Sequence, residues 1–133
     1  MLPHRTRSED FYRAMKFLAA GVDTYGNAVA LLAVHCAISL TDAIMIGCTG
    51  KRCNEEDHRA AVRALSRLCG ERRLDADGIK HFSWLIERKT QFAYGDRRLD
   101  PDKDVKSAVL RADRFTAWAY RIFPEIAKAG QEQ

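Results

Sequence analysis

One stretch of the chain, VALLAVHCAISLTDAIMIG at residues 29–47, limits most strongly what the protein can fold into. It is largely apolar over about five helical turns, and a helix that is apolar all round lies in a protein core or in a membrane. His35 and Asp42 interrupt the stretch, and a charge at the centre of a bilayer costs at least about 2.5–3.5 kcal/mol. We therefore expect a buried helix of a soluble domain and no membrane partner.

Four other segments carry apolar residues at helical spacing, and no segment alternates as a strand does. The predicted helices cover about 8–24, 27–47, 54–69, 78–93 and 101–123. Short links between consecutive helices favour antiparallel neighbours. The sequence thus predicts an all-α fold, an antiparallel up-and-down bundle of four to five helices. Its 133 residues suit a single domain over 1–133, with a core at about 8–124.

The polar residues of the 29–47 stretch are not scattered. At 100° per residue, His35, Ser39 and Asp42 fall within about 60° of one another on a helix. They form one narrow stripe on an otherwise apolar helix. Buried polar groups are normally paired with one another or with a ligand, so we expect partners for this stripe on other helices.

Two residues on other predicted helices are suitable partners. His58 shares a helical face with apolar residues of the third helix, and Lys89 shares one with those of the fourth. In an antiparallel bundle, Asp42, His58 and Lys89 lie at the same end and at similar depth. We predict a polar layer of these three residues, with His35 and Ser39 extending it inward. Arg88 and Tyr94 are expected near its rim.

The chemistry available to this layer is narrow. His58 with Asp42 has the composition of an oriented general base. No nucleophile motif and no phosphate-cradling glycine loop accompany it. The alternative is that the layer only satisfies itself and fixes the register of the helices.

The four cysteines predict no metal site. Cys48 and Cys53 are followed by His58, but no second pair of ligands has zinc spacing. The N-terminal residues contain no secretory signal, so reduced thiols in the cytoplasm are expected. No cofactor is predicted.

The formal charge of +4 and a pI near 9.0 permit an anionic partner without requiring one. Basic residues that the bundle order would gather at the end of the polar layer are Lys51, Arg52, Arg88, Lys89, Arg97 and Arg98. They form either a rim that faces an anion or a solvated basic face.

Two segments together resemble the HEPN superfamily. They are the helix AVALLAVHCAISLTDAIM and the later segment ERKTQFAYGDRRLDPDKDVKSAVLRADRFTAWAYRIF. Arg88 matches the motif arginine of that family, and FAYG (92–95) stands where the family has an ADY-like or His-containing patch. Ala108, Ala112 and Phe115 match the later helix. The resemblance covers roughly residues 27–123.

HEPN domains are helical bundles that commonly dimerise, and many are RNases whose motif places a His after the Arg. Here the corresponding positions hold Ala93, Tyr94 and Gly95, and no histidine follows Arg88. The resemblance therefore implies a homodimer and a non-catalytic binding or accessory module, with an RNA or a nucleotidyltransferase as its partner. On this interpretation, the polar layer is a ligand, RNA or subunit-contact site.

Two alternatives remain at this stage. One is an atypical endoribonuclease that uses Arg88 and Lys89 for phosphate and His58 for proton transfer. The other is a purely structural interaction protein.

Overall fold

The computed structural model describes residues 2–19, 22–51, 57–94 and 99–126. Most of these residues are helical and none of them lies in a strand, which confirms the all-α class. The elements are α1 (Leu2–Ala19), α2 (Val22–Thr49), α3 (His58–Arg72), α4 (Ile79–Glu87), α5 (Lys89–Tyr94), the π-helical turn η1 (Pro101–Val105) and α6 (Lys106–Ile122).

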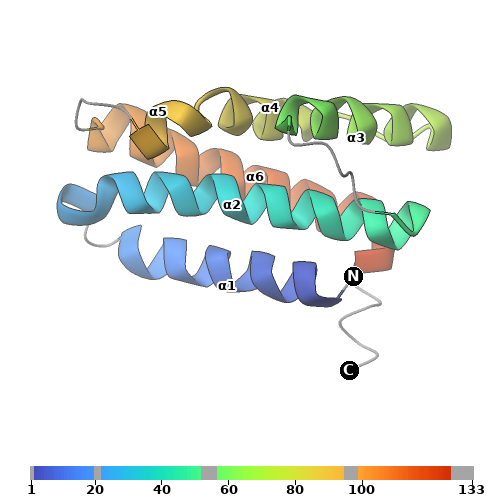
Figure 1. Ribbon diagram of the computed structural model, residues 1–133, viewed down its shortest axis with the longest axis horizontal. Coiled ribbons are helices and arrows are strands. Elements are labelled where there is room, and N and C mark those ends of the chain that lie inside the picture. Colours follow the sequence, from blue (N-terminus) through green and yellow to red (C-terminus); the bar gives the residue numbers. More distant parts are fainter. Residues whose placement is uncertain (1, 20–21, 52–56, 95–98, 127–133) are drawn as a thin grey trace.

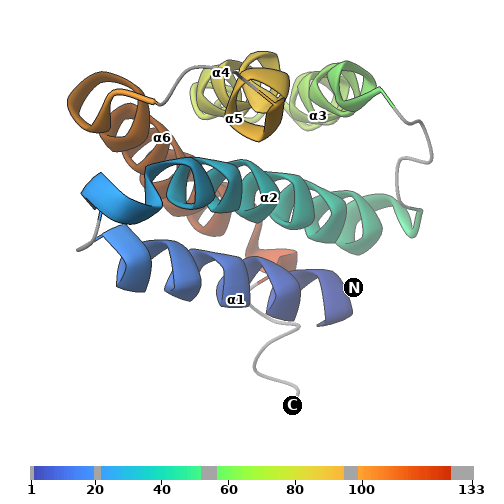
Figure 2. The same cartoon turned by 60° about the vertical axis from the view of Figure 1, so that its left-hand side comes forward.

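The helix α2 runs through the middle of the molecule. α1 lies on one side of it, and α3, α4 and α5 lie on the other (Figure 1). α6 passes alongside α2 and contacts both α1 and α4 (Figure 2). α2 itself contacts every other helical element. The predicted buried helix is therefore the central one.

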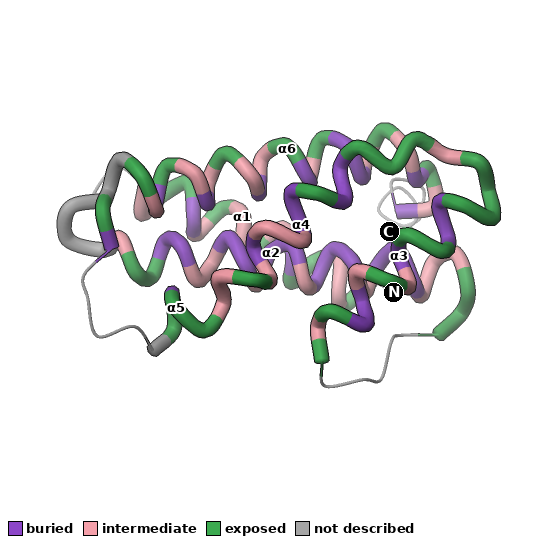
Figure 3. The backbone as a smooth tube through the Cα atoms, turned by 90° about the horizontal axis from the view of Figure 1, so that it is seen from above, coloured by how far each residue is buried: buried purple, intermediate pink, exposed green. Residues whose placement is uncertain are grey.

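Buried residues recur along the length of α2 (Figure 3). By length and composition, Gly26–Thr49 could cross a membrane, but 67% of its apolar window is buried inside the bundle. A core helix of a soluble protein has these same properties. Among the largest fully buried side chains, Leu40 and Ile44 belong to α2 itself, and those from elsewhere in the chain include Phe82, Phe92, Phe115, Phe123, Met15, Leu65 and Leu85.

The direction of α3 differs from the predicted up-and-down order. At its start, His58 lies near enough to Asp42 for the carboxylate to affect the pKa of His58. At its end, Arg72 Nη2 donates to the carbonyl oxygen of Cys48 at 3.5 Å. α3 therefore runs in the same direction as α2. The eight residues 50–57 can span up to about 26 Å, enough to return the chain to the middle of α2.

Helix boundaries also differ from the prediction. The helix expected at about 8–24 ends at Ala19, and α2 begins at Val22. The helix expected at about 78–93 is interrupted at Arg88, whose φ of −104° and ψ of 1° end α4. The break makes Lys89 the first residue of α5.

Candidate functional site

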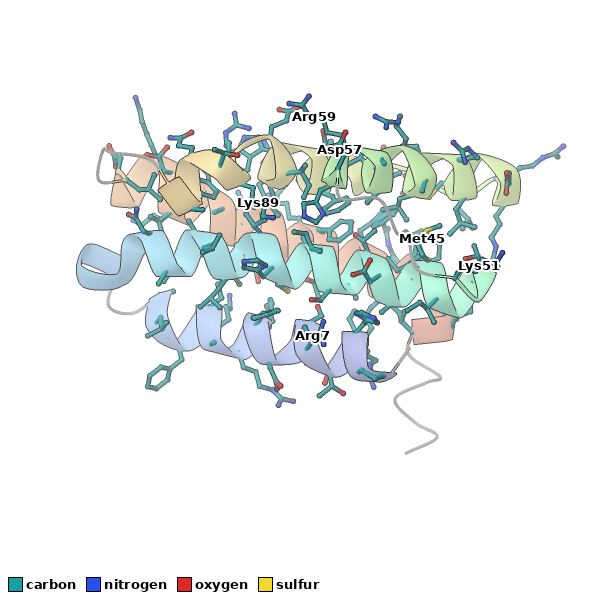
Figure 4. All side chains as sticks on the ribbon, viewed as in Figure 1. Arg7, Met45, Lys51, Asp57, Arg59 and Lys89 are labelled. Atoms are coloured by element: carbon teal, nitrogen blue, oxygen red, sulfur yellow. The ribbon has the colours of Figure 1, made fainter. Side chains whose placement is uncertain are left out.

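The predicted polar layer contains a contact between α3 and α5. Lys89 Nζ lies 3.1 Å from His58 Nε2, although the two residues are 31 positions apart. Lysine can only donate, so His58 accepts at Nε2 and carries its own proton on Nδ1. Figure 4 shows Lys89 between α2 and the tier of α3, α4 and α5. Two of the three residues of the predicted polar layer are therefore in contact.

Two residues of the α2 stripe, Asp42 and His35, contact α1. Asp42 Oδ2 lies 3.8 Å from Nδ1 of His4, and their side chains are 20% and 13% exposed. The His35 ring packs against the Phe11 ring with centroids 5.5 Å apart, and Ser39 is buried. His4 and Phe11 both belong to α1, so α1 also borders the polar stripe. The sequence pattern of α1 does not predict this role.

Both layer histidines have a lowered pKa. Burial lowers the pKa of His58 first, then the charge of Lys89 lowers it further, while Asp42 and Asp57 oppose the change. Burial, Lys89 and His58 lower the pKa of His35 in the same way. Both rings are neutral at pH 7, and both are partly exposed. The layer thus offers a neutral imidazole beside an ammonium group, and it is open to solvent in part.

The two predicted rim residues do not both join the layer. The guanidinium of Arg88 lies over the Trp84 ring, 4.1 Å from its centroid, and donates from Nη1 to the Trp84 carbonyl oxygen at 3.1 Å. Arg88 is therefore held at α4. The side chain of Tyr94 lies outside the described part of the chain, as do Arg52, Arg97 and Arg98 of the predicted basic rim.

Cys48, which was considered as a zinc ligand, forms a hydrogen bond in the fold. Its Sγ donates to Glu125 Oε2 at 2.8 Å, and Arg72 Nη1 donates to the same oxygen at 3.0 Å. Burial and then Glu125 raise the pKa of Cys48 to about 12, so the thiolate that zinc requires is disfavoured there. Cys53 lies outside the described residues. Among those described, no three His, Cys, Asp or Glu side chains are grouped to hold a metal ion.

The lowered histidine pKa values predict how stability depends on pH. Unfolded histidines titrate near pH 6.5, whereas burial and nearby cations lower the pKa of His35, His58 and His81 in the fold. Below about pH 6.5 the unfolded chain binds more protons, so stability falls as pH falls. We expect the melting temperature to drop between pH 7.5 and 5.5, and to drop less in His58→Gln. A melting temperature that is constant or rises over this range would contradict the assignment.

A second site, not predicted from the sequence, lies between α4 and α6. It is a pocket of about 450 Å³. Its lining residues are Asp77, Gly78, Lys80, His81, Arg114, Ala117, Trp118 and Arg121. The two helices are antiparallel here, because Trp118 Nε1 donates to the carbonyl oxygen of Asp75 at 3.0 Å while Arg111 meets His81 further along α4.

A cation–aromatic stack continues from this pocket. Arg111 Nη1 lies 3.1 Å from His81 Nδ1 and therefore donates to it. The Arg111 guanidinium is 5.4 Å from the centroid of the Trp84 ring, which also carries Arg88. Because Arg111 contacts His81, which lines the pocket, the pocket and the stack adjoin, and we name the two together the α4–α6 groove. It comprises Lys80, His81, Trp84, Arg88, Arg111, Arg114 and Arg121.

The charge of the α4–α6 groove is only partly compensated. Arg88 pairs with Glu87 at 3.8 Å, and Arg121 pairs with Asp75 at 3.5 Å. Within the described residues, Lys80 and Arg114 have no carboxylate at ion-pair distance. The groove therefore attracts anions.

A sequence signal for the groove exists. On α6, the residues Arg111, Arg114, Trp118 and Arg121 follow at i, i+3, i+7 and i+10, which places them on one helix face. His81, Trp84 and the C-cap residue Arg88 follow at i, i+3 and i+7, which places them on one face of α4. Only the fold brings the two rows together.

Fold and sites together define an all-helical domain with one polar layer and one basic groove. No protein-family model matches the chain, and no curated protein matches it.

Proposed function

We propose that the chain is a non-catalytic, HEPN-like helical module that binds single-stranded RNA in the α4–α6 groove. One observation carries the proposal: cations of two antiparallel helices line one groove, and two of them, Lys80 and Arg114, lack a carboxylate partner among the described residues. Cations along a groove bind phosphates with little regard to sequence. This groove replaces the polar layer as the primary ligand site.

The cation–aromatic stack favours single strands over duplexes. Arg88 and Arg111 both lie over the Trp84 ring, which holds their guanidinium planes in place. Fixed guanidinium planes and aromatic rings stack on bases, and only unpaired bases present their faces. The groove thus combines phosphate contacts with stacking surfaces.

The endoribonuclease alternative has one observation in its favour. Lys89 at 3.1 Å helps to keep His58 neutral, which is the form that a general base needs. Against it, Arg88 is held at Trp84 instead of beside His58. RNA cleavage that is lost in His58→Ala would favour the alternative.

Binding of a labelled single-stranded RNA, followed by fluorescence anisotropy, tests the proposal. We expect Arg114→Glu to weaken binding at least about tenfold, because it replaces an unpaired cation by an anion. With four phosphate contacts, the logarithm of affinity should fall with the logarithm of salt concentration with a slope of about −3.

The matched control is Arg7→Glu. Arg7 is exposed on α1, on the opposite side of α2 from α4 (Figure 4), and the substitution changes the net charge by the same amount. It should bind within about twofold of the wild type if the groove rather than net charge binds RNA. Equal weakening by both variants, or no binding by the wild type at low salt, would overturn the proposal.

Three further properties stay predictions of the resemblance and the sequence. They are a homodimer, a nucleotidyltransferase as an alternative partner, and a cytoplasmic location.

A further inference from the structure

The pocket at the Gly78 end of the α4–α6 groove differs from the rest of it. Its volume of about 450 Å³ lies in the range of small-molecule sites, whereas an RNA backbone needs only an open track. Three cations, Lys80, Arg114 and Arg121, line it together. This concentration of charge at one place suits a compact anion.

The cations of the pocket suit a dianion. Its lining holds three cations and one carboxylate, Asp77. Arg121 is paired with Asp75 at 3.5 Å, whereas Lys80 and Arg114 have no carboxylate at ion-pair distance among the described residues. His81 contributes no charge at neutral pH, because burial and Arg111 lower its pKa. Since Arg111 donates to Nδ1, the neutral ring carries its proton on Nε2, where it can donate to an anion.

Two carboxylates lie at the Gly78 end of the groove. Asp77 lines the pocket, and Asp75 lies beside it in contact with Arg121 at 3.5 Å. A polyanion that continued in this direction would pass two carboxylates. In the other direction, Arg111 connects the pocket to Trp84 and Arg88. A strand fits best if it ends in the pocket.

We infer that this pocket binds the terminal phosphomonoester of an RNA strand. The inference rests on the proposed function and names the form of RNA that the groove prefers. A terminal phosphomonoester carries about −1.5 to −2 charges at pH 7, whereas an internal diester carries one. Two cations without a carboxylate partner, Lys80 and Arg114, in one pocket therefore favour the phosphorylated end, which can be the 5′ or the 3′ end of the strand.

Three oligonucleotides of one sequence test the inference: one with a 5′-phosphate, one with a 3′-phosphate and one with hydroxyls at both ends. We expect one phosphorylated form to bind at least about tenfold more tightly than the hydroxyl form. The end whose phosphate raises the affinity is the end that binds in the pocket. Adenosine monophosphate should compete with that form.

Variants separate the pocket from the groove. Lys80→Gln should reduce the preference for the phosphorylated end to about twofold or less, while Lys80→Arg should keep it. Arg88→Gln, in the groove but outside the pocket, should weaken all three oligonucleotides equally and leave their ratio unchanged. Thermal melts of each variant confirm that it is folded.

The outcomes distinguish this inference from the proposed function. Equal affinity for all three oligonucleotides, with Arg114→Glu still weakening binding, overturns the terminal-phosphate inference and leaves the RNA-binding function intact. A preference that survives Lys80→Gln also overturns it. No binding to any oligonucleotide overturns both.

Discussion

Replacing Gly78 with alanine is expected to destabilise the fold by about 3 kcal/mol, near the upper end of overpacking effects. A Cβ at this position would overlap the indole ring of Trp118. The ring has little freedom to move, because it is 4% exposed, packs against Phe115 and Phe123, and donates from Nε1 to the Asp75 carbonyl oxygen. Thermal unfolding should show a melting temperature about 10 °C lower than that of the wild type.

Gly70→Ala is the matched control for this substitution. Gly70 lies in α3, is exposed, and has no heavy atom within 4 Å of a Cβ built there. Alanine favours the helix by about 0.5–1 kcal/mol, so this variant should be more stable than the wild type. If the two variants unfold at the same temperature, the close packing of Gly78 on Trp118 is wrong.

Phe115→Ala has the second of the two largest expected effects, a loss of about 3–5 kcal/mol. Phe115 is fully buried on α6, with ring centroids 5.2 Å from Phe82 and 5.6 Å from Trp118. It thus joins α4 to α6 beneath the groove. The measurement is the free energy of unfolding from a urea titration.

Leu110→Ala on the same helix is the control for Phe115→Ala. Its side chain is 47% exposed, so its removal should cost less than about 1 kcal/mol. A cost for Phe115→Ala as small as that for Leu110→Ala would contradict the position of the core.

The sequence predicted the central helix and placed His58 and Lys89 in one polar layer, where they are in contact. Apolar patterning identifies α2, because a nearly continuous apolar helix can only be stable when buried. The layer that contains His58 and Lys89 was predicted from their places on apolar faces and from an antiparallel order of the helices. That order does not hold for α3, and His58 reaches the layer because α3 starts beside the middle of α2.

The direction of α3 and the α4–α6 groove could not be predicted in the same way. A link such as 50–57 permits either direction, and its length alone does not choose between them. The basic rows on α4 and α6 are each readable as an ordinary solvated helix face. Contacts such as Arg111 with His81 and Trp118 with Asp75 join residues 30 and 43 positions apart, and only tertiary packing determines them.

Photocrosslinking of bound single-stranded RNA, followed by peptide mapping, tests the central claim most directly. RNA that lies in the α4–α6 groove should crosslink to peptides that contain Trp84 and the cations of α4 and α6, and Arg114→Glu should reduce these crosslinks at least about tenfold, in line with its weaker binding. Crosslinks confined to α1 or α3, or crosslinks in the groove that Arg114→Glu leaves unchanged, would contradict the claim.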